Sequence, residues 1–398
     1  MENKLNQHLL NAAKIVAAAF VVSGIFSSCT KSSATANTGP VLPAEAIRGT
    51  TLNGGNVKGV MLTDSTYTIN GDITVLKGDT LSVQPGATIN IPANHAFYIQ
   101  GSFMSLGTQQ KPVVFQSPTA LPGQWGGFQA DSAQAVTVKW TKILWAGGPD
   151  STGGTRQTIG ISSPITVDIE DSWFIGGQDN SIGVYSAANV TILRNTFQGN
   201  GTTDGDCIDF HSGVTGTVAY NVLWGGAGSA IKVFTSALIK NPQTNVTVYN
   251  NTCIDNGFRR GAAEPGRGIL VDAFSTGKFY NNLIVNNYDG LDITPTSEFS
   301  TVVYGNNYFY ATVDSLVPRF YPAGSKGVPQ SSDIISQTTG ANNPMFVNYT
   351  PPPNPSLRIM PPTYDFHLKA GSPAIGKGNP TYNNDIGAYT SDGKGNLH

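Results

Sequence analysis

Apolar and polar residues alternate along much of the chain with a period of two, the pattern of a β-strand that buries one face. Between Val57 and Phe115 the apolar residues come in pairs two positions apart, and turns rich in glycine separate these pairs. The pattern therefore predicts a series of short strands joined by tight turns. The pairs are Tyr67 and Ile69, Ile73 and Val75, Leu81 and Val83, Ile89 and Ile91, and Phe97 and Ile99.

Five segments between residues 190 and 310 share one sequence shape. Each begins with β-branched or aromatic residues, passes through an asparagine, and ends with apolar residues. A second strand pattern, with apolar residues at alternate positions, lies between consecutive asparagine segments. Because the two patterns alternate, each repeat contains at least two strands, which is typical of a stacked solenoid. The aligned asparagines are Asn195, Asn221, Asn251, Asn282 and Asn307, at spacings of 26, 30, 31 and 25 residues.

The repeat length distinguishes between the repeat architectures. Coils of about 25 residues match a parallel β-helix, whereas a propeller blade needs about 40 residues and four antiparallel strands. We therefore predict an all-β chain that forms a single-stranded, right-handed parallel β-helix (solenoid) over residues 44–340. Residues 341–398 contain a proline-rich stretch at 351–362 and are predicted to form a closing segment, a C-terminal capping unit at the end of the solenoid.

Two stretches outside the repeats carry a resemblance to known proteins. They are residues 78–87, which read GDTLSVQPGA, and residues 364–376, which read YDFHLKAGSPAIG. With these stretches and its repeats, the chain resembles the pectate-lyase-like superfamily of right-handed parallel β-helix proteins, and within it secreted bacterial lipoproteins. The resemblance implies a fold, and it does not by itself imply a reaction.

The first residues have the pattern of an export signal. An apolar run from Ile15 to Phe26 follows two lysines, and its 12 residues are too few for a transmembrane helix, which needs about 20. The run is followed by Ser27-Ser28-Cys29, which resembles the bacterial lipobox and implies a lipid on Cys29. We expect a lipoprotein signal peptide over residues 1–28 and a flexible tether over residues 29–43. The mature protein would then be exported and membrane-anchored, in the periplasm or at the cell surface.

Composition narrows the range of partners. The chain has 23 basic and 25 acidic residues and a net charge of -2, so it lacks the basic surface that attracts nucleic acid. We therefore exclude nucleic acid as a partner. We also expect the protein to be a monomer. Apart from Cys29, the cysteines are Cys207 and Cys253, and the sequence leaves open whether these two form a disulfide.

Stacking of the coils predicts two outward columns of side chains. In the second strand pattern the apolar residues fill the interior, so the residues between them face outward, and adjacent coils lie about 4.8 Å apart. Asp209 and Lys232 should then come within ion-pair distance, with His211 on the strand of Asp209. The first column is Gly183, Asp209, Lys232, Leu270 and Asp292, and the second is Tyr185, His211, Phe234, Asp272 and Thr294.

The long loop over residues 256–267 adds charge beside these columns. It contains Arg259, Arg260 and Arg267, and loops on a rigid scaffold commonly carry binding groups. We predict a groove between this loop and the columns that binds an extended, acidic polysaccharide. Its substrate-binding residues would be Tyr185, Arg259, Arg260, Arg267, Asp272 and Asp292.

The resemblance to polysaccharide lyases implies a mechanism for this groove. A Lys or Arg would abstract the proton α to a uronate carboxylate, and Ca²⁺ held by acidic residues would neutralise that carboxylate. The predicted catalytic residues are Lys232, Asp209 and His211, with Lys232 or an arginine of the loop as the base. The predicted Ca²⁺ ligands are Asp206, Asp209 and Asp292.

Two other functions remain compatible with the sequence. Asp209 with Asp206 or Asp292 could serve as the carboxylate pair of a glycoside hydrolase, and Asp204-Gly205-Asp206 resembles part of the polygalacturonase pattern. Alternatively, the protein could be a non-catalytic surface adhesin or scaffold. In that case Asp209 and Lys232 would form a surface ion pair that contributes about 0–1 kcal/mol.

Overall fold

The computed structural model describes residues 45–261 and 264–398. The predicted signal peptide, most of the predicted tether and the predicted lipidation site Cys29 lie outside these described residues. Within them, no helix has the length and apolar character needed to cross a membrane.

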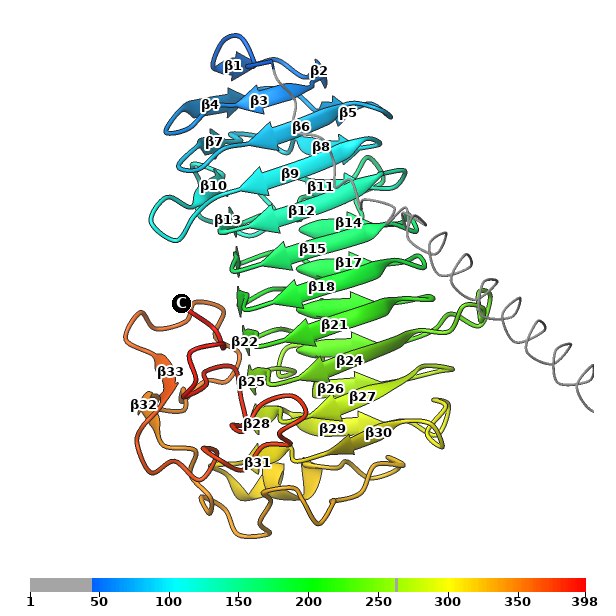
Figure 1. Cartoon of the computed structure of the whole chain (residues 1–398), viewed down its shortest axis with the longest axis vertical. Coiled ribbons are helices and arrows are strands. Elements are labelled where there is room, and N and C mark those ends of the chain that lie inside the picture. Colours follow the sequence, from blue (N-terminus) through cyan, green and yellow to red (C-terminus); the bar gives the residue numbers. More distant parts are fainter. Residues whose placement is uncertain (1–44, 262–263) are drawn as a thin grey trace, which may run out of the picture. The chain divides into compact units, whose positions relative to one another are not determined.

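Each coil contributes one strand to each of three parallel sheets (Figure 1). Sheet 1 contains β1 (Thr51–Leu52), β4 (Thr66–Ile69), β7 (Thr88–Asn90), β10 (Val113–Gln116), β13 (Thr141–Leu144), β16 (Trp173–Ile175), β19 (Thr196–Gln198), β22 (Val222–Trp224), β25 (Thr252–Ile254), β28 (Leu283–Val285) and β31 (Tyr308–Tyr310). Sheet 2 contains β2 (Gly55–Asn56), β5 (Ile73–Val75), β8 (Ala96–Ile99), β11 (Gly127–Ala130), β14 (Ile159–Ile161), β17 (Ile182–Val184), β20 (Ile208–Phe210), β23 (Ile231–Val233), β26 (Arg267–Val271) and β29 (Asp289–Ile293). Sheet 3 contains β3 (Gly59–Met61), β6 (Thr80–Val83), β9 (Ser102–Leu106), β12 (Ala135–Lys139), β15 (Thr166–Glu170), β18 (Asn189–Leu193), β21 (Thr215–Ala219), β24 (Asn245–Tyr249), β27 (Thr276–Tyr280) and β30 (Val303–Gly305).

The asparagine segments of the sequence form the bend between sheet 3 and sheet 1. In each bend the residue before the asparagine adopts a left-handed conformation, as at Arg194 with φ 55° and Tyr220 with φ 58°. The asparagine that follows is fully buried and bonds to the equivalent asparagine of an adjacent coil; Asn221 Nδ2, for example, donates to Asn251 Oδ1 at 2.9 Å. Each predicted segment is therefore two strands separated by a bend, which raises the number of strands per coil to three. The five asparagines form one continuous ladder.

The interior of the solenoid is filled by the inward members of the alternating pattern. A group of five aromatic side chains, each no more than 1% exposed, fills several N-terminal coils, and the Phe103 and Phe128 rings lie 4.7 Å apart. Cys207 and Cys253 are free thiols buried in the same core, and burial raises the pKa of each. The dense packing makes the coils a rigid support for outward side chains. The five aromatic residues are Phe97, Phe103, Phe115, Trp125 and Phe128.

The C-terminal end of the solenoid is covered by the segment that follows β31. It includes the 3₁₀-helix η1 (Asp314–Arg319), whose Leu316 and Val317 are buried. The Phe320 carbonyl accepts a hydrogen bond from the Leu291 amide at 2.9 Å, so this segment continues the hydrogen bonding of sheet 2. Residues 311–340 therefore cover the last coil.

Residues 341–398 form a distinct unit that lies beside sheet 1 (Figure 1). It contains the antiparallel pair β32 (Phe346–Asn348) and β33 (Asp365–Leu368). Its Phe346, Phe366 and Ile386 pack against outward residues of sheet 1, including Trp224. The unit thus covers a side of the solenoid, whereas the sequence predicted a cap on its end. The physical reason is that sheet 1 has an apolar outer face in these coils, which must be buried.

Asp255 joins this C-terminal unit to the solenoid. Its carboxylate accepts hydrogen bonds from the Tyr349 hydroxyl at 2.8 Å and from Trp224 Nε1 at 2.9 Å. Burial raises the pKa of Asp255 to about 7. The folded state therefore holds a proton that the unfolded state releases at lower pH, and stability should fall as pH rises through this window.

We expect Asp255→Asn to remove this pH dependence. The wild-type free energy of unfolding should fall by about 2 kcal/mol more than that of Asp255→Asn between pH 5 and pH 7. Urea denaturation at several pH values measures the difference. Glu298→Gln, which neutralises an exposed carboxylate, should behave like the wild type. Identical pH profiles for wild type and Asp255→Asn would contradict the assignment.

Candidate functional site

The outward columns predicted from the sequence are present on sheet 2. Asp209 lies opposite Gly183 on one side and opposite Lys232 on the other, and Leu270 lies opposite Lys232 and Asp292. In the second column the His211 ring lies 4.7 Å from the Tyr185 ring and 5.2 Å from the Phe234 ring. The predicted register of this face is therefore confirmed.

Asp209 and His211 form a hydrogen-bonded pair at the centre of this face. His211 Nε2 lies 2.7 Å from Asp209 Oδ2, and Asn180 Nδ2 donates to the same oxygen at 3.0 Å. The His211 side chain is 30% exposed, whereas that of Asp209 is 4% exposed. Nδ1 of His211 bonds to none of the residues that the structure describes. A buried carboxylate thus orients an accessible imidazole, the arrangement of a general base with its positioning group.

Lys232 lies close to two carboxylates without a direct hydrogen bond to either. Its Nζ is 3.8 Å from Asp209 Oδ1 and 3.9 Å from Asp206 Oδ2. Burial opposes the charge of Lys232, but the negative charges of Asp209 and Asp206 outweigh burial and raise its pKa. The lysine therefore stays an ammonium at neutral pH. This disfavours the predicted role of Lys232 as the base, because a base needs a lowered pKa.

Asp206 is the most buried carboxylate of the group. Burial, followed by the charge of Asp209, raises the pKa of Asp206 to about 6. Its Oδ1 accepts the Ser229 amide at 2.5 Å and lies 3.4 Å from Arg260 Nη1. With its side chain only 2% exposed, Asp206 cannot itself contact a substrate.

The two neighbouring arginines of the long loop have different surroundings. Arg260 forms ion pairs with Asp204 at 3.0 Å, Glu264 at 3.0 Å and Asp206 at 3.4 Å, so it closes one side of the charged group. Arg259 instead donates to backbone carbonyls of Asn200, Gly201, Gly225 and Leu357. Burial lowers the pKa of Arg259 to about 10. The Arg259 guanidinium thus holds turns of the chain together, which disfavours the predicted role of Arg259 in substrate binding.

The remaining predicted residues lie further along the solenoid. Arg267 pairs with Asp292 at 3.1 Å, and Asp272 accepts hydrogen bonds from the hydroxyls of Thr294 at 2.8 Å and Thr296 at 3.0 Å. Asp292 is three coils from Asp209, a separation of about 14 Å. The residues Asp206, Asp209, His211, Lys232 and Arg260 form one cluster, the Asp209 group. Arg267, Asp272 and Asp292 can extend a groove, but they do not join the Asp209 group.

The predicted Ca²⁺ ligands Asp206, Asp209 and Asp292 are therefore not assembled. Asp206 and Asp209 have Lys232 between them, and Asp292 is neutralised by Arg267. Within residues 45–261 and 264–398, no three His, Cys, Asp or Glu side chains are grouped so as to hold a metal ion. The site residues do not fit a bound Ca²⁺.

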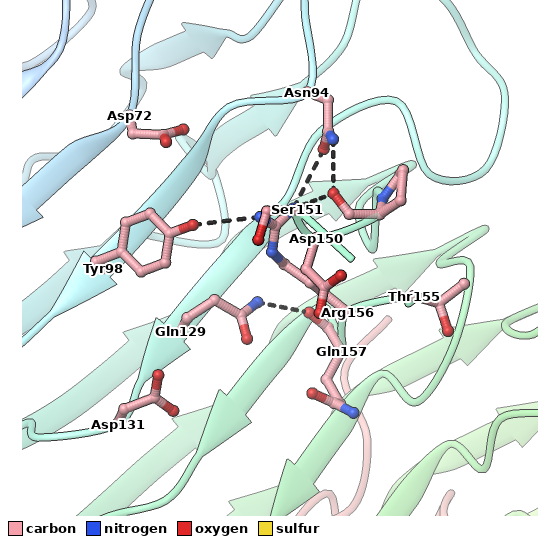
Figure 2. Close-up of a pocket in the computed structure, with 11 residues that line it drawn as sticks. Asp72, Asn94, Tyr98, Gln129, Asp131, Asp150, Ser151, Thr155, Arg156 and Gln157 are labelled. Carbon is pink, nitrogen blue, oxygen red and sulfur yellow. Dashed lines mark hydrogen bonds between the residues drawn. The ribbon is translucent and has the colours of Figure 1, made fainter. Parts of the chain in front are cut away.

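The sequence analysis missed a pocket on the same face of sheet 2, nearer the N-terminus (Figure 2). Its volume is about 530 Å³, and Tyr98 and Gln129 in its wall belong to the outward column that continues to Asp209. The period-two pattern could have placed Tyr98 and Gln129 on this face. The pocket is lined by Asp72, Asn94, Tyr98, Gln129, Asp131, Pro149, Asp150, Ser151, Thr155, Arg156 and Gln157.

Two family models that match this chain agree with this architecture. Residues 54–137 match a family model described as a pectate-lyase like beta helix domain, and residues 126–308 match one described as a right handed beta helix region. Exopolygalacturonase rpg16 of Rhizopus delemar is 22% identical over 294 residues, which cover 71% of this chain and 74% of that protein. The chain in the crystal structure of pectate lyase Pel9A is 16% identical to this chain in sequence. The match covers 77% of this chain and 84% of the Pel9A chain, with a TM-score of 0.34. With its three parallel sheets and these family-model matches, the chain is a right-handed parallel β-helix of the pectate-lyase-like fold.

Proposed function

We propose that the protein binds an extended acidic polysaccharide along the outward face of sheet 2 and cleaves it by β-elimination at His211. The observation that carries this proposal is the 2.7 Å contact between His211 and Asp209 beside the Lys232 ammonium. The partial similarity to a protein named exopolygalacturonase supports a polysaccharide as the ligand.

Each group has a separate part in the proposed reaction. With Nε2–H donated to Asp209, His211 Nδ1 takes the proton α to the uronate carboxylate. The bond between the neighbouring β carbon and the glycosidic oxygen then breaks with its electron pair on the oxygen, a carbon–carbon double bond forms, and the proton held by His211 passes to the departing oxygen. Lys232 stabilises the negative charge that develops on the carboxylate, because its raised pKa keeps it charged. No step requires a metal ion.

Hydrolysis by paired carboxylates is the second candidate. The raised pKa of Asp206 beside Asp209 supports it, since two such carboxyls can act as acid and base. Both side chains, however, are almost completely buried, and an acid catalyst must contact the glycosidic oxygen. Elimination at the more exposed His211 therefore fits the geometry better.

An assay that detects both reaction types tests the proposal. The full chain would be incubated with polygalacturonate, alginate and glycosaminoglycans while ultraviolet absorbance and new reducing ends are followed. We expect absorbance from an unsaturated uronate to rise together with reducing ends on at least one polymer, without added Ca²⁺. Reducing ends without absorbance would indicate hydrolysis and contradict elimination. Binding with neither signal would support the adhesin alternative.

Lys232 gives a finer test of the same mechanism. Lys232→Met removes the ammonium and keeps the length of the side chain, so we expect kcat to fall by a factor of about 10 to 10². A Lys232→Arg variant should keep more activity, because it retains the positive charge. Equal activity of Lys232→Met and the wild type would contradict the role of the ammonium.

Export and membrane anchoring through Cys29 and a monomeric state remain predictions from the sequence.

A further inference from the structure

The pocket near the N-terminus is built from side chains of consecutive coils and one loop (Figure 2). Tyr98 and Gln129 come from β8 and β11 of sheet 2, and Asp131 follows β11 directly. The loop over residues 149–157 forms the opposite wall. The pocket therefore stands on the same rigid face as the Asp209 group.

Arg156 holds the loop in place. Its Nη1 donates to the carbonyls of Pro149 at 2.5 Å and Gly148 at 3.1 Å and to Asn94 Oδ1 at 3.4 Å. Its Nη2 donates to the Tyr98 hydroxyl at 3.2 Å. Figure 2 shows Asn94 and Tyr98 directed at this guanidinium. The cation in the pocket is thus engaged in fixing the wall.

The charge of the pocket opposes an acidic ligand. Asp72, Asp131 and Asp150 line it against the single cation Arg156. Hydrogen bonds from Thr152 and Gly154 lower the pKa of Asp150, so this carboxyl is ionised at neutral pH. A uronate would meet a surplus of negative charge, which costs free energy.

The remaining polar groups suit hydroxyls. Gln129 uses its amide nitrogen for carbonyls of the chain, at 2.9 Å and 3.1 Å, and no hydrogen bond from a described residue reaches its Oε1. The Gln157 side chain likewise has no hydrogen bond within the described part of the chain. Amide and carboxylate oxygens that accept from sugar hydroxyls, beside an aromatic ring such as Tyr98, are the elements of a site for a neutral sugar.

One outward column of sheet 2 links this pocket to Asp209, the partner of His211. Between Gln129 and Asp209 the outward column holds only Gly160 and Gly183. A Cβ at Gly183 would lie 2.8 Å from the Tyr185 ring and 2.9 Å from Gln157 Cγ, so the side chains of Tyr185 and Gln157 lie directly over Gly183. Gln157 lines the pocket, and Tyr185 stacks beside His211. The three coil intervals from Gln129 to Asp209 span about 14 Å, room for a few linked sugars.

We infer that this pocket binds a neutral, hydroxyl-rich sugar unit of the same polymer whose uronate linkage lies at His211. The inference rests on the proposed function for the assignment of the polymer, but binding in the pocket can be measured without catalysis. It makes the substrate a heteropolymer in which a neutral unit lies a fixed distance from the cleaved linkage.

Saturation-transfer NMR on the full chain tests the inference. The probes are methyl glycosides of galactose, glucose, mannose, xylose and rhamnose, compared with those of galacturonate and glucuronate. We expect at least one neutral glycoside to bind and both acidic ones to bind at least tenfold more weakly at the pocket. Gln157→Ala should weaken the neutral ligand tenfold or more, and His211→Asn should leave its binding unchanged.

Charge reversal gives an independent arm of the experiment. Asp131 is exposed and accepts no hydrogen bond from the described residues, so Asp131→Lys should fold normally and gain affinity for the acidic glycosides. The inference is overturned if no neutral glycoside binds, if uronates bind the wild-type pocket equally well, or if Gln157→Ala changes nothing. Binding of a neutral glycoside without cleavage of any polymer would contradict only the proposed reaction. Cleavage of a pure polyuronate without binding of any neutral glycoside would contradict only the inference about the pocket.

Discussion

Replacement of His211 by asparagine is expected to lower kcat/KM for the cleaved polymer by a factor of about 10² to 10⁴. The loss follows from the removal of Nδ1, the accessible nitrogen that takes the proton in the proposed elimination. Asparagine can still donate to Asp209, so the fold and polymer binding should persist. The effect should therefore fall mainly on kcat, measured from initial rates of ultraviolet absorbance.

The chain offers a matched control for this substitution. His367 also pairs with an aspartate, Asp365, at 2.7 Å, but it lies in the C-terminal unit. His367→Ala should keep wild-type activity. An active His211→Asn enzyme would remove His211 from the mechanism, whatever the fate of the other residues. A variant with reduced thermal stability and reduced polymer binding would point to a structural role instead.

Asn251→Ala is expected to lower the free energy of unfolding by about 3 to 5 kcal/mol. Asn251 is fully buried; its Nδ2 donates to Val218 O at 3.0 Å and Asn282 Oδ1 at 3.0 Å, and its Oδ1 accepts from Asn221 Nδ2 at 2.9 Å. Alanine would leave several of these groups buried without partners. Each such group costs about 1–3 kcal/mol.

An exposed asparagine separates this effect from the general effect of the substitution. Asn245 begins β24 and faces solvent, so Asn245→Ala should change stability by no more than about 0.5 kcal/mol. Urea midpoints of the two variants give the comparison. Equal midpoints would mean that the asparagine ladder does not contribute the expected stability.

The register of the outward columns could be predicted because it depends on two local signals. Alternation decides which residues of a strand face outward, and the aligned asparagines fix how far the chain advances per coil. These signals were sufficient to bring Asp209, Lys232 and His211 together. They carried no information about the pKa of Lys232, because that pKa depends on burial and on the combined charges of Asp209 and Asp206, and Asp206 lies in a turn outside the alternating pattern.

Other parts of the site depend on contacts between distant segments. The direction of Arg259 is set by carbonyls of Asn200 and Leu357, and no local pattern encodes that choice. The pocket at Arg156 was missed because the N-terminal coils lack the asparagine that marks later bends. Trp140 and Asp171 occupy the left-handed positions of earlier bends, so the repeat was not visible there.

The return of residues 341–398 along sheet 1 affects how the molecule comes apart. A linear array of coils can ordinarily lose its terminal coil first and then fray inward, since each coil contacts only its neighbours. Here Arg358 donates to Gly177 O and Asn396 donates to Asn195 O, so the C-terminal unit, residues 341–398, is hydrogen-bonded to coils in the middle of the array. The coils that the C-terminal unit contacts must therefore unfold together as one cooperative block. Fraying one coil at a time is then confined to the N-terminal coils.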